Sequence, residues 1–148
     1  ERYYIAYGSN MNLPQMAKRC PTAKVVGSAK MRNWRLMFRG GERGAVATVE
    51  RARGKKVPVL VWRLQPADEE ALDAYEGYPH LYRKETLRIT VGGRRVYAMI
   101  YIMNEQNNPY GSPSSYYLNT ISEGYRTAGF DLQPLYTAIF DSRKEKSK

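Results

Sequence analysis

Residues 96–103 read VYAMIYIM, a run of eight apolar or aromatic side chains without a charge. In a strand, valine, alanine and isoleucine would occupy one face and tyrosine and methionine the other, because successive side chains alternate. Neither face is polar, so both are predicted to be covered by other parts of the protein. Any fold for this chain must provide that cover.

Further segments rich in β-forming residues occupy much of the remaining chain. Gly92 and Gly93 lie between two of them and are typical of a two-residue hairpin turn. Gly40, Gly41 and Gly54 separate the segments in the middle of the chain. We predict six or seven strands at residues 2–7, 24–31, 34–38, 45–51, 57–64, 82–91 and 95–103.

Caps and prolines mark helices between these strands. A polar cap followed by proline is typical of a helix start, and a glycine commonly follows a helix end. These signals predict helices after Asn12 and Pro14, from Pro66 to Gly77, from Ser112 and Pro113 to about Ala128, and a short one capped by Asp131.

So many strands in a chain of 148 residues favour a sheet that closes on itself. We therefore predict an α+β fold, a small mixed and mostly antiparallel β-barrel flanked by helices. The length and the lack of a linker-like segment predict a single domain over residues 1–141. The basic residues 142–148 are expected to form a flexible tail.

The residue inventory argues against several classes of function. Cys20 and His80 are the only cysteine and the only histidine, too few for a disulfide framework, a structural zinc site or a nucleophilic triad. Charged residues interrupt every apolar stretch well before the ~18 residues that a membrane span requires. The sequence starts at Glu1 without a signal-like apolar region, and we expect a cytoplasmic protein with no membrane partner and no metal.

The net charge of +10 makes nucleic-acid binding an alternative to consider. Part of this charge lies in the terminal RKEKSK segment, and the other basic residues are scattered over strand positions rather than gathered in one run. They are not accompanied by a nucleic-acid-binding motif. We interpret the charge as a source of solubility and of attraction for anionic ligands, and rank nucleic-acid binding last.

The first predicted strand ends in the polar stretch Tyr7, Gly8, Ser9 and Asn10, just before a helix. A glycine at such a junction lets successive backbone N–H groups converge on an anion, and a carboxylate would suit this place. The alternative is that Gly8 only turns the chain while Ser9 or Asn10 bonds its own backbone.

Glu76 stands at the end of a predicted helix whose first turn is already acidic. The negative end of the helix dipole opposes its ionisation by about 0.3–1 kcal/mol, which raises a carboxyl pKa by less than ~1 unit. Strong activation of Glu76 as a base would also require burial. The alternative is a solvated glutamate at a helix end.

The 13 tyrosines are an unusual share of the chain. A tyrosine combines an apolar ring with one hydrogen-bonding tip, which suits the wall of a pocket for a small polar ligand. The alternative for most of them is a place in the core.

Three segments together resemble the γ-glutamylcyclotransferase-like family, which includes γ-glutamylamine cyclotransferases and the AIG2-like plant avirulence-induced proteins. They are YIAYGSNMN, LDAYEGYPHLYRKE and GSPSSYYLNTISEGYRTAGF, and they occur in the order typical of the family between residues 3 and 130. The resemblance implies a small mixed β-barrel with a loop and a glutamate facing each other across a cavity.

The resemblance also implies roles for individual residues. The loop formed by Tyr7, Gly8, Ser9 and Asn10 would bind the α-carboxylate end of a γ-glutamyl group. Glu76 would be the general base, Tyr82 and Tyr117 would line the pocket, and the loops at 40–44 and 104–112 would select the leaving group.

The implied reaction is attack of the α-amine of a γ-glutamyl compound on its own γ-carbonyl, which releases an amine and 5-oxoproline. A positioned carboxylate can move the protons of this reaction, so we expect no cofactor. A non-catalytic module that binds small carboxylates is the alternative. The sequence gives no information on the oligomeric state.

Overall fold

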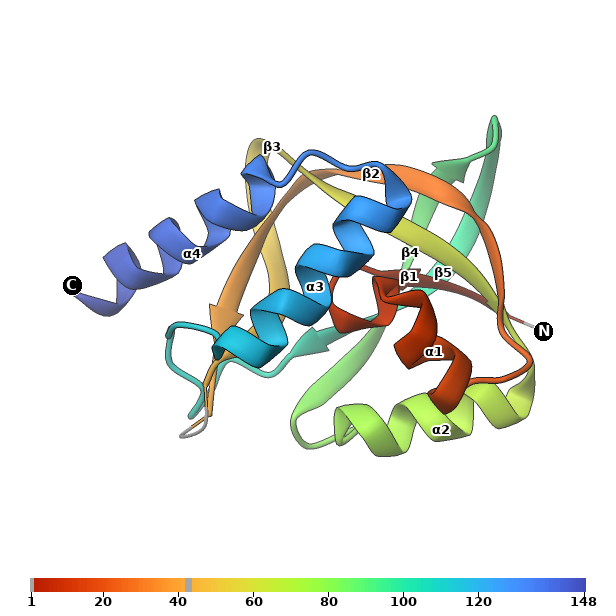
Figure 1. Ribbon diagram of the computed structural model, residues 1–148, viewed down its shortest axis with the longest axis horizontal. Coiled ribbons are helices and arrows are strands. Elements are labelled where there is room, and N and C mark those ends of the chain that lie inside the picture. Colours follow the sequence, from red (N-terminus) through yellow and green to blue (C-terminus); the bar gives the residue numbers. More distant parts are fainter. Residues whose placement is uncertain (1, 42–43) are drawn as a thin grey trace.

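The computed structural model describes residues 2–41 and 44–148, which form a five-stranded sheet with helices packed around it (Figure 1). The strand order is β2-β3-β1-β5-β4, and β1 pairs antiparallel to β3 and parallel to β5. The strands are β1 (Arg2–Ala6), β2 (Lys24–Arg39), β3 (Val46–Leu64), β4 (Tyr82–Val91) and β5 (Arg94–Met103).

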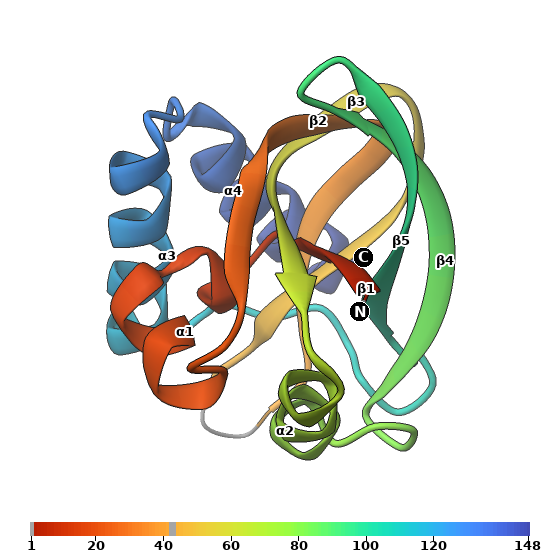
Figure 2. The same cartoon turned by 90° about the vertical axis from the view of Figure 1, so that its right-hand side faces the viewer.

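The α+β class and the mostly antiparallel sheet are confirmed, but the sheet does not close into a barrel. Its two edge strands, β2 and β4, form no ladder with each other in the described chain, although the sheet curves strongly (Figure 2). The edges approach each other where Gly27 faces Val91, because a Cβ atom on Gly27 would lie 3.1 Å from Val91 Cγ2. The structure is therefore a curled, open sheet.

The predicted count of six or seven strands is wrong, because β2 and β3 each span two of the predicted segments. Asn33 and Gly54 adopt left-handed backbone conformations, with φ of 67° and 81°. The pairing shifts register between Arg32 and Trp34 and then continues, and the Gly54 amide donates to Asn33 Oδ1 at 3.0 Å. The residues expected to break the strands make an irregularity within a continuous ladder instead.

The predicted helices are present, with one start displaced. Asn12 caps α1 by accepting from the Gln15 amide, and Gly77 ends α2 in a left-handed conformation. The N-cap of α3 is Ser114 rather than Ser112, since its hydroxyl accepts from the Tyr117 amide. The helices are η1 (Ser9–Met11), α1 (Leu13–Arg19), α2 (Pro66–Glu76), α3 (Ser115–Ala128) and α4 (Gln133–Lys146).

Most of the residues expected to form a flexible tail belong to α4, which continues to Lys146. Asp131 Oδ1 accepts from the Gln133 amide, but the N-cap of this helix is Leu132 and the helix has 14 residues, so the prediction of a short helix capped by Asp131 is wrong. Ser142 is fully buried and its hydroxyl accepts from the Phe38 amide of β2 at 2.9 Å. This anchor explains why the chain stays helical beyond residue 141.

The strand that reads VYAMIYIM is covered over residues 98–103, which are all buried, but Tyr97 is 65% exposed, so the prediction of cover on both faces is wrong at this end of the strand. Residues 98–103 belong to one core cluster that also draws on the other strands and on α1 to α4, which supports our proposal of a single domain. Within the described residues, the helices are all too short or too polar to cross a membrane.

Helix α3 packs tightly against η1, the short helix that follows β1. A Cβ atom on Gly124 would lie 2.9 Å from the carbonyl carbon of Met11 and 3.0 Å from the Asn12 nitrogen. Backbone atoms cannot yield as a flexible side chain can, so only glycine fits this position without displacing η1. The contact fixes the loop that contains Ser9 and Asn10.

We expect Gly124→Ala to lower the free energy of unfolding by about 1–3 kcal/mol, the cost typical of overpacking. Thr127→Ala, at an exposed position of the same helix, is the control and should change it by less than about 0.5 kcal/mol. Urea unfolding monitored by circular dichroism measures both. Equal stability of Gly124→Ala and the wild type would contradict the tight contact.

Candidate active site

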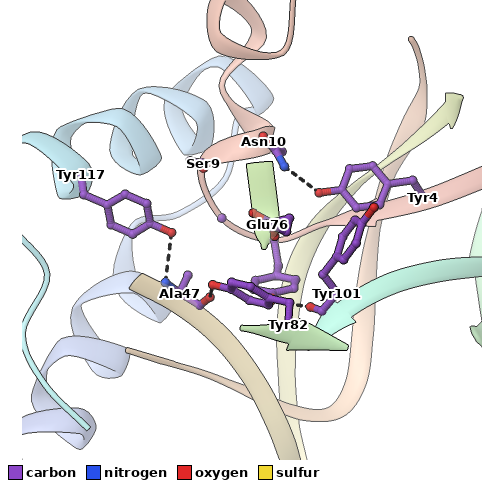
Figure 3. Close-up of a pocket in the computed structure, with 10 residues that line it drawn as sticks. Tyr4, Ser9, Asn10, Ala47, Glu76, Tyr82, Tyr101 and Tyr117 are labelled. Atoms are coloured by element: carbon purple, nitrogen blue, oxygen red, sulfur yellow. Dashed lines mark hydrogen bonds between the residues drawn. The ribbon is translucent and has the colours of Figure 1, made fainter. Parts of the chain in front are cut away.

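One pocket lies at the end of β1, where η1, α2 and α3 meet the sheet (Figure 3). Its cavity volume is about 20 Å³. Its lining includes all the residues that the sequence predicted for the site, namely Tyr7, Gly8, Ser9, Asn10, Glu76, Tyr82 and Tyr117. Tyr4, Ala47 and Tyr101 also line it.

The turn after β1 brings backbone amides to the pocket. Within η1 the first internal hydrogen bond runs from the Met11 amide to the Gly8 carbonyl, so the amides of Ser9 and Asn10 have no partner inside this helix. Gly8 passes close to the sheet, because a Cβ atom there would lie 3.2 Å from Ala47 Cβ and 3.4 Å from Tyr117 Oη. The turn therefore has little freedom to move.

The Asn10 side chain is held in place from both ends. Its Nδ2 donates to the Tyr4 hydroxyl at 2.8 Å, and its Oδ1 accepts from Arg19 Nη1 at 2.5 Å. The Arg19 guanidinium also lies over the Tyr75 ring, 3.5 Å from its centroid, and donates to Gln15. Asn10 thus links β1 to α1 at the edge of the pocket.

A single residue of β3, Ala47, joins the sheet to the opposite side of the pocket through its backbone N–H and C=O groups. The Tyr82 hydroxyl donates to the Ala47 carbonyl at 2.7 Å, and the Ala47 amide donates to the Tyr117 hydroxyl at 3.0 Å (Figure 3). These two bonds place a tyrosine of β4 and a tyrosine of α3 on either side of β3. The pocket wall is built from three separate elements.

The hydrogen bonds divide the tyrosines of the pocket into two kinds. Tyr7 and Tyr82 use their hydroxyl protons on the carbonyls of Tyr101 and Ala47. Tyr4 and Tyr117 instead accept, from Asn10 and from the Ala47 amide, so each keeps a proton to donate. Burial raises the pKa of both above the usual value for tyrosine, which keeps them protonated.

Glu76, the last residue of α2, points into the middle of the pocket (Figure 3). Its carboxylate accepts no hydrogen bond from the part of the chain that the structure describes. Burial raises its pKa from 4.5 to about 7, and the positive charge of Arg19 partly opposes this shift. Glu76 therefore has the properties of a general base at neutral pH.

Sequence reasoning missed three pocket residues. Tyr4 lies next to Tyr3 in a run of β-formers, and the run itself does not reveal which of these two neighbours faces the pocket. Tyr101 lies in the covered strand β5 and was assigned to the core. Ala47 contributes its backbone N–H and C=O groups, and such a role cannot be predicted from the side-chain pattern.

The two loops implied to select the leaving group lie next to each other. The Gly40 amide donates to the Pro109 carbonyl at 2.8 Å, and the Ala45 amide donates to the Ser112 carbonyl at 2.9 Å. Residues 42 and 43 of the first loop lie outside the described residues. The described residues of both loops line a separate depression rather than the pocket of Glu76.

The comparisons with known proteins agree with this geometry. A family model described as "Gamma-glutamyl cyclotransferase, AIG2-like" matches residues 4–119, so the chain belongs to this family. It is similar to a curated γ-glutamylcyclotransferase of Homo sapiens, with 26% identity over 139 residues, 88% of this chain and 73% of that protein. The corresponding protein of Mus musculus is 28% identical over 135 residues, 85% of this chain and 71% of that protein.

Solved structures support the fold. One named "Gamma-glutamyl cyclotransferase" superposes with a TM-score of 0.82 at 24% identity, covering 93% of this chain and 85% of that one. A solution structure of an Arabidopsis thaliana protein gives a TM-score of 0.60 at 14% identity, covering 99% of this chain and 86% of that one. At such identities the likeness concerns the fold alone.

The raised pKa of Glu76 predicts a pH-dependent stability. Between pH 4.5 and about 7 the folded protein retains a proton that the unfolded chain has lost, so ionisation of Glu76 lowers stability as the pH rises through this window. At pH 8, Glu76→Gln is therefore expected to stabilise the fold by up to about 3 kcal/mol, at ~1.4 kcal/mol per pKa unit.

Urea unfolding at pH 4 and pH 8 measures this effect. Glu70→Gln, at an exposed position of the same helix, is the matched control and should show the same difference from the wild type at both pH values. A Glu76→Gln variant whose difference from the wild type does not grow with pH would contradict the burial of this carboxylate.

Proposed function

We propose that this protein is a γ-glutamyl cyclotransferase in which Glu76 is the general acid and base. The observation that carries the proposal is an unpaired, buried carboxylate, with a pKa of about 7, in the same pocket as the backbone amides of Ser9 and Asn10. The family to which the chain belongs supports the same reaction.

In the proposed reaction, Glu76 accepts a proton from the α-ammonium group of a γ-glutamyl substrate. The freed nitrogen attacks the γ-carbonyl carbon and forms the C–N bond of a five-membered ring. The bond from this carbon to the leaving nitrogen then breaks as Glu76 returns the proton to that nitrogen. The ring nitrogen still has one proton too many, and Glu76 takes this proton and passes it to the released amine, which leaves as an ammonium ion. The products are 5-oxoproline and the released amine, and a base with a pKa near neutrality suits these proton transfers.

The remaining pocket groups have matching roles in this proposal. The amides of Ser9 and Asn10 bind the α-carboxylate, since both residues line the pocket and their amides have no partner inside η1. Tyr4 and Tyr117 have hydroxyl protons to donate, so either can stabilise the negative charge that develops on the carbonyl oxygen. Tyr7 and Tyr82 shape the pocket, because their protons are already engaged.

The protein's largest contribution is to hold the substrate in a folded conformation. Nucleophile and electrophile belong to one molecule, and an intramolecular reaction gains most from correct orientation. Proton transfer by Glu76 and hydrogen bonds from tyrosines lower the reaction barrier further, and the proposed mechanism uses no cofactor. Holding the α-carboxylate and the γ-carbonyl group of the substrate in place is sufficient to define the reactive conformation.

We expect the protein to release 5-oxoproline from at least one member of a panel of γ-glutamyl amino acids and γ-glutamylamines. Glu76→Gln keeps the shape of the side chain but cannot accept the proton, and should lower turnover at least about 100-fold. Glu70→Gln is the control and should retain wild-type turnover, because this side chain is exposed and outside the pocket. Chromatographic detection of 5-oxoproline measures all three proteins.

Two results would contradict the proposal. Turnover by Glu76→Gln at the wild-type rate would remove Glu76 from its proposed role. Saturable binding of the compounds without any 5-oxoproline would instead favour a non-catalytic module that binds small carboxylates.

The proposed role of Glu76 also predicts a pH profile. The specificity constant kcat/KM should rise with pH through about 7, because the base must be ionised in the free enzyme. Arg19→Met removes the charge that lowers the Glu76 pKa, so it should move this rise to higher pH. Arg19→Lys keeps a positive charge and should shift the profile less; coincident profiles for the Met variant and the wild type would contradict this coupling.

A further inference from the structure

A second hollow lies between the two edge strands of the open sheet, away from Glu76. It is bounded by residues 30–34 of β2 and 87–90 of β4 and has a volume of about 420 Å³. Ile5, Met31, Trp34 and Ile89 form an apolar floor, and each is at most 5% exposed. We call this hollow the edge groove.

The edge groove exists because β2 and β4 diverge. The strands touch where Gly27 meets Val91, and they lie apart on either side of the groove further along β2. In the described chain, β2 pairs with β3 only and β4 with β5 only, apart from a single bridge of Arg39 to Tyr110 beyond the groove. Each strand therefore presents one edge of backbone N–H and C=O groups to the groove.

Basic side chains surround this opening. Lys30, Arg32, Arg51, Arg88 and Arg95 line the groove, and all five are exposed. Acidic side chains are missing from the lining, and among the described residues none of the five cations forms a salt bridge. Other arginines of the protein, such as Arg2, Arg35 and Arg83, do pair with glutamates. The groove thus concentrates positive charge that the protein itself does not neutralise.

We propose that the edge groove binds an extended acidic peptide segment of a partner protein. The peptide adds a strand to the free edge of β2 or β4, and its backbone hydrogen bonds supply affinity as in other cases of strand addition. Side chains of a strand alternate, so apolar residues at every second position cover the floor while acidic residues between them meet the cations. Such a peptide would pair with a free strand edge and would also neutralise the cations around the groove.

Single-stranded nucleic acid fits these observations less well. Proteins that bind it offer exposed aromatic rings on which bases stack. The aromatic ring of this groove, Trp34, is 5% exposed and lies beneath the Arg51 guanidinium, 4.5 Å from the ring centroid. The groove offers backbone edges in place of a stacking surface.

The test uses the full chain and three fluorescein-labelled probes of known composition. The first is the peptide Ac-(Glu-Val)₄-NH₂, which alternates acidic and β-branched residues. The second, Ac-(Glu-Pro)₄-NH₂, has the same charge but lacks every second backbone N–H and cannot add a strand. The third is an oligothymidylate of eight nucleotides. Fluorescence anisotropy at low and moderate salt measures binding of each.

We expect saturable binding of the Glu-Val peptide that weakens with added salt, and at least about tenfold weaker binding of the Glu-Pro peptide. The variant Arg32→Gln/Arg88→Gln/Arg95→Gln should weaken binding of the Glu-Val peptide about tenfold. The matched control Lys18→Gln/Arg126→Gln/Lys144→Gln removes the same charge from exposed positions outside the groove and should weaken it less than about threefold. Thermal unfolding of both variants verifies that they are folded.

Several outcomes would overturn the proposal. Equal weakening by the groove variant and its control would reduce the effect to net charge. Equal binding of the two peptides would exclude strand addition. Binding of the oligothymidylate, but not of the Glu-Val peptide, with loss in the groove variant would identify a nucleic-acid site instead.

Discussion

The backbone of Ala47 connects three elements of the pocket, because its N–H and C=O groups bond tyrosines of α3 and β4 to β3. Tyr82 donates to its carbonyl and Tyr117 accepts from its amide, so a shift of either element would break a hydrogen bond shielded from water. A Cβ atom at residue 8 would also lie only 3.2 Å from the methyl group of Ala47, a tight contact that disfavours a side chain there. The loop that follows β1 is thus fixed by the sheet below it and by Gly124 of α3 above it.

The way in which α2 uses its carboxylates makes Glu76 reactive. Asp68 completes the N-terminal capping box and accepts from Thr22, and Glu69 and Asp73 are paired with Lys84. Glu76 alone is buried without a hydrogen-bond donor among the described residues, and the nearby Arg19 is already engaged with Asn10 and Gln15. The positive charge of Arg19 lowers the Glu76 pKa only from a distance, so the rise in pKa caused by burial is the larger effect. The ionised form of Glu76 therefore destabilises the fold, as expected for a base that is active near pH 7.

The sequence was sufficient for the class of fold, the caps Asn12 and Gly77 and seven of the ten pocket residues, since each depends on local chemistry or on ordered motifs. It was insufficient where the structure depends on contacts between residues that are distant in the sequence. Asn33 and Gly54 are typical strand breakers, yet they lie opposite each other and form an irregularity that the ladder tolerates. Ser142 looked like part of a polar tail because its partner, the Phe38 amide, is distant in sequence. For Glu76, dipole reasoning gave the correct direction of the pKa shift, but its size comes from burial, which depends on the folded environment.

The central strand β1 separates the pocket from the edge groove. Tyr4 lines the pocket and its neighbour Ile5 lies in the floor of the groove, as expected for successive residues of a strand, whose side chains point to opposite faces. The charges are separated in the same way: Arg19 is the cation that affects the Glu76 pKa, and the five cations of the groove have no part in it. A protein with a net charge of +10 can therefore keep a glutamate with a raised pKa, because its positive charge is concentrated where solvent and salt screen it from the pocket.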